Sequence, residues 1–228
     1  MLSDLDIIKN IEQIFKNIEK INKNVILVAV TKTVSTEKIL VAYNTGIRYF
    51  GESKIQEALP KIEILKDKND LNWHFIGHLQ SNKVKKAVDN FSLIQSVDSL
   101  QLAEKISEVA LSESKIIDVL IELNISNEKT KFGFLKENFE QVLEKLKELK
   151  GIKIKGLMTI APYFEDANKA RPYFKEMKRI FDEIAKSKIE NIEMEYLSMG
   201  MTNDYLVAME EGANMIRIGT GIFGKRNY

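Results

Sequence analysis

Eight short apolar runs recur along the 228-residue chain, and the segments between them have a helical pattern. Each run is rich in valine, isoleucine or aromatic residues, which is typical of buried β-strands. The intervening segments carry apolar residues at spacings of three and four, as amphipathic helices do. The predicted strands are residues 25–30, 47–52, 73–77, 92–97, 116–125, 152–160, 194–199 and 215–219.

This alternation, over a length close to the usual size for that fold, predicts an α/β protein built as a (β/α)8 TIM barrel. An open doubly wound sheet is the second choice. No proline-rich or glycine/serine-rich linker divides the chain, so residues 1–228 are expected to form a single domain. An extra helix precedes the first strand and is expected to close the amino-terminal end of the barrel, with an apolar stripe of Ile8, Ile11, Phe15 and Ile18.

The composition excludes several classes of protein. The sequence has no cysteine, which removes thiol nucleophiles, cysteine zinc sites and disulfides. Its 34 Lys+Arg against 33 Asp+Glu give a net charge of +1, so no bulk field would draw it to nucleic acid or to an anionic membrane. No signal peptide and no apolar run of membrane-spanning length are recognisable. We therefore expect a cytoplasmic protein that binds neither nucleic acid nor membrane.

The alternation of side chains along each strand predicts which of them enter the barrel, because the apolar set should face the helices. His74 in the third strand and Arg217 in the eighth then point inward, as do Asp118 and Glu122 in the fifth. Lys32 shares the inward parity of the first strand and falls just past its carboxyl end. Polar side chains therefore converge on the mouth where barrel proteins place their sites.

Arg217 is the sharpest case, because an inward charge is costly unless something pairs with it. One interpretation is an internal ion pair with Glu122 or Asp118, since structural ion pairs imitate functional sites. The other interpretation is that Arg217 contacts a bound ligand.

Two loops at this mouth combine glycine with a hydroxyl side chain. Residues 198–200 follow the seventh strand and residues 219–221 follow the eighth. Barrels that bind phosphate use these two loops, because glycine lets backbone N–H groups approach the oxygens. Glycine also ends strands and makes turns, so only the position of the loops favours an anion site. Ser198 and Thr220 would add hydroxyl donors there.

Lys32 has two interpretations. It is either a surface residue whose stem covers apolar side chains, or a partly buried amine that acts as a nucleophile. Beside a phosphate site, a nucleophilic amine suits imine formation with a phosphorylated aldehyde, of which pyridoxal 5′-phosphate (PLP) is the obvious one. Arg217 would then face the pyridine nitrogen and, because arginine keeps its proton, would leave that nitrogen unprotonated.

Six motifs carry a resemblance to a known family. They are AVTKT (29–33), FGES with IQEA (50–58), WHFIGHLQSNK (73–83), GLMTIAP (156–162), LSMGMTNDY (197–205) and RIGTGIFG (217–224). Together they resemble the pyridoxal phosphate homeostasis protein family, which is similar to the barrel domain of alanine racemase. The resemblance runs from about residue 25 to residue 224. It implies a monomeric or weakly associating barrel that binds PLP, has no established turnover and helps to control free vitamin B6.

The resemblance also implies roles for individual residues. Lys32 corresponds to the lysine that forms a Schiff base with PLP, and Arg217 corresponds to the partner of the pyridine nitrogen. The sequence departs from the family at Ser53, where the family usually has asparagine, so a contact near the cofactor is in doubt. The phosphate binders correspond to Ser198, Gly200, Gly219 and Thr220.

We expect a PLP carrier rather than an enzyme. Racemases of the related fold need a second acid/base, supplied partly by another domain and another subunit. A chain of this length has no room for that domain, and none of its seven tyrosines lies in a recognisable second-base motif. The expected partners are PLP and apo-enzymes that need it, and the expected oligomeric state is the monomer.

Several alternatives stay open at this point. A racemase-like PLP enzyme, or a lysine-imine aldolase acting on a phosphorylated substrate, would use the same lysine and anion site. The basic run at residues 82–86 prompts an RNA-associated role, but the near-neutral charge and the lack of interleaved aromatic residues favour a solvated helix start. Both histidines lie in one short motif without converging carboxylates, so we expect no metal site.

Overall fold

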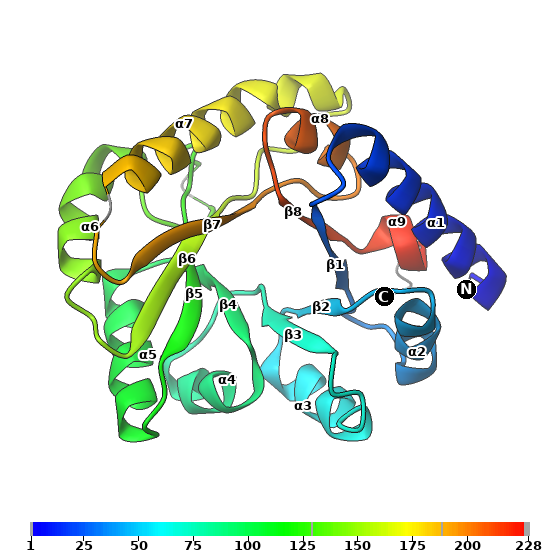
Figure 1. Cartoon of the computed structure of the whole chain (residues 1–228), viewed down its shortest axis with the longest axis horizontal. Coiled ribbons are helices and arrows are strands. Elements are labelled where there is room, and N and C mark those ends of the chain that lie inside the picture. Colours follow the sequence, from blue (N-terminus) through cyan, green and yellow to red (C-terminus); the bar gives the residue numbers. More distant parts are fainter. Residues whose placement is uncertain (1, 129, 188, 226–228) are drawn as a thin grey trace.

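The computed structural model describes residues 2–128, 130–187 and 189–225. Within that part of the chain, eight β-strands close into a barrel in chain order, and all neighbouring pairs are parallel. A ring of helices surrounds the barrel (Figure 1). The predicted (β/α)8 TIM barrel with an extra amino-terminal helix is confirmed.

All eight predicted strands are present, with ends that differ by a few residues. The apolar runs continue past the last paired residue, because the chain turns there into the loops of the mouth. Ile160, for example, lies beyond the end of its strand and is 37% exposed. The strands are β1 (Ile26–Val30), β2 (Tyr49–Glu52), β3 (Asn72–Phe75), β4 (Leu93–Val97), β5 (Ile117–Glu122), β6 (Ile152–Met158), β7 (Ile192–Ser198) and β8 (Met215–Ile218).

The helices bury apolar side chains against the outer face of the barrel. None of those described is long and apolar enough to cross a membrane. The α-helices are α1 (Asp4–Ile21), α2 (Thr36–Asn44), α3 (Ile55–Ile64), α4 (Val84–Asn90), α5 (Leu100–Ser112), α6 (Phe139–Leu146), α7 (Arg171–Ser187), α8 (Tyr205–Glu210) and α9 (Thr220–Phe223), and the short 3-10 helices are η1 (Ser81–Lys83), η2 (Lys136–Asn138) and η3 (Ala167–Ala170).

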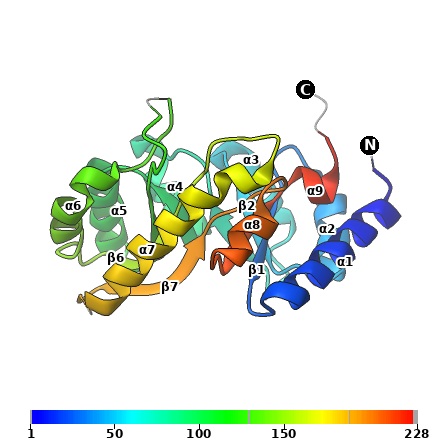
Figure 2. The ribbon, with the colours of Figure 1, turned by 90° about the horizontal axis from the view of Figure 1, so that it is seen from above.

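The amino-terminal helix α1 lies in the outer ring and does not close the end of the barrel, so that expectation was wrong. It packs beside α2, α8 and α9, as both views of the ribbon show (Figures 1 and 2). Its Asn10 side chain donates to the Ile222 carbonyl of α9 at 3.0 Å. The helices α8 and α9 are short, which leaves part of the outer barrel wall for α1 to cover. Its buried stripe is Ile7, Ile11, Ile14 and Ile18.

The interior of the barrel holds its own apolar cluster, separate from the larger core between strands and helices. Trp73, Phe75 and Ile216 belong to the outer core, as the strand parity predicts. The division between inward and outward side chains is therefore correct for these strands. The inner cluster consists of Val28, Leu93, Leu120, Met158 and Met215.

Pairing is irregular along β6, where the register shifts against both β5 and β7. Gly156 has a φ of +146°, and a Cβ atom there would lie 1.9 Å from the Tyr196 carbonyl oxygen. Only glycine permits this approach of the two backbones. After the irregularity, Met158 pairs with Ser198, which places both at the carboxyl end of the barrel.

Candidate functional site at the mouth of the barrel

Arg217 of β8 lies inside the barrel and is only 4% exposed. Its Nη1 donates to Ser198 Oγ at 2.6 Å, and its Nη2 donates to the Thr159 carbonyl at 2.9 Å. Ser198 is the last residue of β7, and Thr159 directly follows β6. Two neighbouring strands therefore hold the planar guanidinium in one orientation.

The internal ion pair considered from the sequence does not form among the described residues. The bonds of Arg217 go to a hydroxyl and a carbonyl, and Asp118 lies near Lys153 and Lys155 instead. Burial lowers the pKa of Arg217 to about 10, and the negative charges of Glu122 and Asp204 offset only part of that shift. A buried cation without a carboxylate contact is costly, and such groups concentrate at functional sites.

A chain of hydrogen bonds continues from Arg217 across the barrel interior. Ser198 Oγ donates to Gln95 Oε1 at 2.7 Å, and Gln95 Nε2 lies 2.9 Å from His74 Nδ1. Burial lowers the pKa of His74 to about 3, so the imidazole is neutral and its Nδ1 accepts from the Gln95 amide. This chain fixes Ser198 and, through Ser198, the guanidinium.

Ser198 is a predicted site residue that is completely buried. Its hydroxyl is already used by Arg217 and Gln95. A contact with a phosphate would require the hydroxyl to exchange Gln95 for the anion. Ser198 therefore stays a predicted phosphate residue, with an observed role in orienting Arg217.

Glu122 is a second inward-facing ionisable residue and is 7% exposed. Burial and the nearby charge of Asp98 raise its pKa to about 7, against the opposing effect of Arg217 and His78. Asp98 itself lies 2.7 Å from His78 Nδ1. The carboxyl group of Glu122 therefore exchanges its proton near neutral pH inside the barrel.

The two glycine-containing loops that follow β7 and β8 contact each other. Thr220 Oγ1 donates to Thr202 Oγ1 at 3.2 Å, and the Gly221 N–H donates to the same oxygen at 3.1 Å. Gly200 has a φ of +91°, and a Cβ atom there would lie 2.6 Å from the Ala208 Cβ, so the loop requires glycine. The two loops that are predicted to bind phosphate therefore contact each other through Thr202.

Lys32 is half-buried just past the end of β1. It lines a cavity of about 350 Å³ together with Gly219 and Phe223. Small-molecule pockets begin at about this size. The structure therefore brings the predicted nucleophile and one of the predicted phosphate residues to the same hollow.

Strand parity alone missed three polar residues of this site. Strand parity could have found Gln95, because it lies two residues after Leu93 in β4 and therefore points into the barrel as Leu93 does. Thr202 lies in the LSMGMTNDY motif but joins the site only through its loop contact with Thr220. Thr159 acts through its backbone carbonyl, for which the side chain carries no signal.

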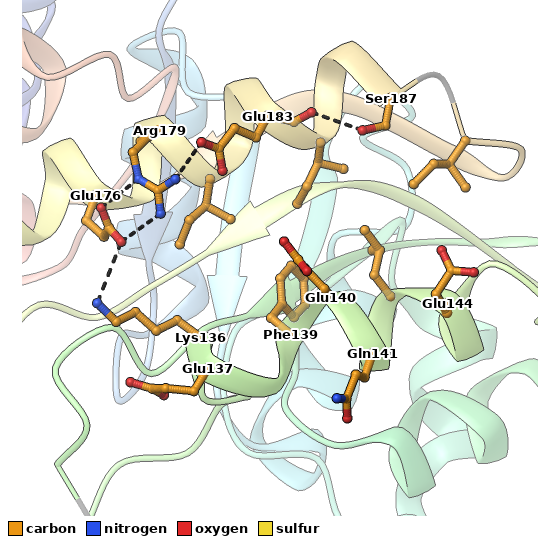
Figure 3. Close-up of a pocket in the computed structure, with 14 residues that line it drawn as sticks. Lys136, Glu137, Phe139, Glu140, Gln141, Glu144, Glu176, Arg179, Glu183 and Ser187 are labelled. Atoms are coloured by element: carbon orange, nitrogen blue, oxygen red, sulfur yellow. Dashed lines mark hydrogen bonds and ion pairs between the residues drawn. The ribbon is translucent and has the colours of Figure 1, made fainter.

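Another hollow lies between α6 and α7 in the outer ring (Figure 3). Its volume is about 650 Å³, and its wall combines glutamates with apolar side chains. Arg179 projects into it and pairs with Glu176 at 2.9 Å and with Glu183 at 2.5 Å. Because Arg179 is already paired with glutamates on the outside of the barrel, we keep the mouth as the candidate functional site.

The fold and the mouth together define a barrel of the alanine racemase type. The family model described as "Alanine racemase, N-terminal domain" matches residues 7–227. The "Pyridoxal phosphate homeostasis protein" of Aquifex aeolicus is 45% identical over 202 residues, which cover 89% of this chain and 87% of the relative. The chain belongs to the pyridoxal phosphate homeostasis protein family, as its motifs predicted.

Solved structures agree with this assignment. PipY of Synechococcus elongatus, solved with PLP bound, is 33% identical with a TM-score of 0.86, and the match covers 96% of this chain and 100% of PipY. Alanine racemase of Clostridium difficile has a TM-score of 0.73 at 19% identity, covering 96% of this chain and 57% of the racemase. The likeness to the racemase shows the fold alone.

Proposed function

We propose that this chain binds PLP as a Schiff base with Lys32 and takes part in intracellular vitamin B6 homeostasis. The observation that carries the proposal is the meeting of Lys32 and Gly219 at one cavity. The strand that leads into Gly219 also carries the buried guanidinium of Arg217, which contacts no carboxylate among the described residues. The family membership and the PLP-bound structure of PipY support it.

The residues at the mouth fit the three recognisable parts of PLP. When bound, PLP supplies an aldehyde carbon that reacts with a primary amine, and Lys32 offers that amine at the rim. Arg217 offers fixed N–H donors to the pyridine nitrogen. The phosphate would lie against the contacting loops, where the proposed binders are Gly200, Gly219 and Thr220, with Ser198 behind them.

The proposed role is that of a carrier without catalytic turnover. An arginine beside the pyridine nitrogen does not protonate it, so the ring is a weaker electron sink than it would be with an acidic partner. The curated relative is named for homeostasis and not for a reaction. We propose that the cofactor passes to apo-enzymes that need it, and that the chain acts as a monomer in the cytoplasm.

Titration of purified protein with PLP tests the proposal. The wild-type protein should gain the visible absorbance of a protein Schiff base at a stoichiometry of about one. Lys32→Ala should lose that absorbance while keeping weaker, phosphate-dependent binding. Lys86→Ala, at an exposed lysine of α4, is the control and should behave as wild type. Steady racemisation of an amino acid by the loaded protein would contradict the carrier role.

A further inference from the structure

A second polar network lies outside the barrel wall, between β2 and α3, next to the end of β1. Its centre is Lys61 of α3, which is only 8% exposed. Lys61 Nζ donates to Glu52 Oε1 at 2.7 Å, to Glu57 Oε1 at 2.8 Å and to the Thr31 carbonyl at 2.8 Å. An ammonium has three hydrogens, so all of them are used inside the protein.

Two bonds of this network reach the peptide groups on either side of Lys32. The Thr31 carbonyl belongs to the peptide group before Lys32 and accepts from Lys61. The Thr33 N–H belongs to the peptide group after Lys32 and donates to Glu57 Oε1. Because Glu57 is also ion-paired with Lys61, one ammonium and one carboxylate hold both peptide groups.

The backbone at this point has an unusual conformation that needs such support. Thr33 has a φ of +63°, in the left-handed region that is unfavourable for a β-branched residue. The Val34 N–H closes the turn onto the Thr31 carbonyl at 2.9 Å. Thr31 Oγ1 also donates to Glu52 at 2.7 Å. The chain therefore leaves β1 through a fixed turn that carries Lys32.

The same network is a poor way to gain stability. Glu52 is completely buried, burial raises its pKa, and its Oε2 has no hydrogen-bond partner among the described residues. Replacing buried ionic clusters by apolar side chains is often neutral or stabilising. A costly cluster attached to both peptide groups of the proposed nucleophile suits a role in positioning that residue.

We propose that Lys61 and Glu57 are positioning residues for Lys32. They fix its two peptide groups and so direct its amine into the cavity that Gly219 lines. This inference rests on the proposed function, because it concerns the same amine.

The first test uses the protein without added PLP. In Lys61→Met, amide hydrogen exchange in residues 31–34 should accelerate roughly tenfold or more, while exchange in β5 stays as in wild type. Lys66→Met is the matched control, since Lys66 lies just past α3 and pairs with Glu63 on the surface. Unchanged exchange in residues 31–34 would overturn the inference.

The second test separates covalent capture from binding. Lys61→Met should slow Schiff-base formation with PLP roughly tenfold to a hundredfold, because a small misplacement of a reacting group has effects of that size. Its affinity for pyridoxine 5′-phosphate, which lacks the aldehyde, should stay within about twofold of wild type. Equal losses in both measurements would indicate general damage to the mouth and contradict a positioning role.

A pair of variants at Glu57 carries the same test if Lys61→Met fails to fold. Glu57→Ala removes the acceptor for the Thr33 N–H and should slow Schiff-base formation, whereas Glu57→Gln keeps an acceptor oxygen and should restore most of the rate. Equal rates in both would contradict the inference. If wild-type protein forms no Schiff base at Lys32, the proposed function fails, and the hydrogen-exchange test still decides whether the network holds this turn.

Discussion

At the amino ends of β6 and β7 the barrel surrounds its charged side chains with opposite charges, whereas at the carboxyl ends it buries a guanidinium that no described carboxylate contacts. Lys155 lies 2.7 Å from Glu193 and 2.5 Å from Glu195 at the amino end. Arg217 at the carboxyl end is held by a hydroxyl and a carbonyl.

This difference in charge pairing indicates that the two ends of the barrel contribute differently to stability and to binding. Charges that neutralise each other near the surface need no ligand and contribute modestly to stability. A buried cation without such a partner costs stability, and proteins keep such costs mainly where function requires them. We therefore propose that the amino end of the barrel contributes stability and that the carboxyl end contributes binding.

The largest effect expected is that of Arg217→Met. Affinity for PLP should fall roughly a hundredfold, because charge-assisted hydrogen bonds to the ligand are lost. The free energy of unfolding of the protein without PLP should stay the same or rise, because a buried charge disappears. PLP titration and denaturant unfolding measure the two quantities. The affinity of Arg217→Lys for PLP should lie between those of wild type and Arg217→Met. A large loss of stability in Arg217→Met with unchanged affinity for PLP would contradict the proposed role of Arg217 in binding.

Glu122→Gln should change the pH dependence of stability. The pKa of Glu122 is raised from 4.5 to about 7, so the folded protein holds a proton that the unfolded chain releases. Wild-type stability should therefore decline as pH rises from about 4.5 to about 7, by about 3 kcal/mol from this group, and change no further from this group above that range.

Urea unfolding at several pH values measures this decline, which Glu122→Gln should remove. Glu12→Gln, at an exposed residue of α1, serves as the control and should keep the wild-type profile. A decline of equal size in Glu122→Gln would show that another group causes it.

Lys155→Met tests the amino end of the barrel. The free energy of unfolding should fall by about 1 kcal/mol, since the carboxylates around Lys155 are partly solvated. Affinity for PLP should not change. A tenfold or larger loss of PLP affinity in this variant would show that the two ends are not separate.

The smallest expected effect is the loss of stability at acidic pH that protonation of Glu193 causes. Hydrogen bonds from Lys153 and Lys155 lower the pKa of Glu193 from 4.5 to about 2. The stabilisation from this group is therefore complete above about pH 4.5 and is lost as pH falls toward 2. The thermal unfolding temperature of wild type should fall more steeply with pH across that range than the unfolding temperature of Lys155→Met. Parallel plots of unfolding temperature against pH would contradict the pairing of Glu193 with Lys155.

The sequence alone predicted the barrel and much of its interior, because strand parity is a strong signal when one face packs against helices. Arg217 and His74 point inward for this reason. Strand parity could not place α1. An amphipathic stripe predicts that one face of a helix is buried, but it does not identify the elements that pack against that face. The stripe itself shifted from Ile8 and Phe15 to Ile7 and Ile14 because register is weakly defined in an isoleucine-rich helix.

The network around Lys61 was beyond prediction from sequence. Lys61 is one of many lysines in the sequence and is distinguished only by the three acceptors that the fold brings to it. The unusual backbone of Thr33 likewise arises from tertiary contacts. Predicted features of the chain that the structure leaves open, among them the monomeric state, the recipient apo-enzymes and the effect of Ser53, stay predictions.

Borohydride reduction of the PLP-loaded protein, followed by peptide mapping, tests the central claim most directly, because reduction makes a Schiff base permanent at the lysine that formed it. The phosphopyridoxyl label should lie on Lys32 and be absent from it in Lys32→Ala. A label on another lysine, with Lys32 unmodified in loaded wild-type protein, would contradict the account.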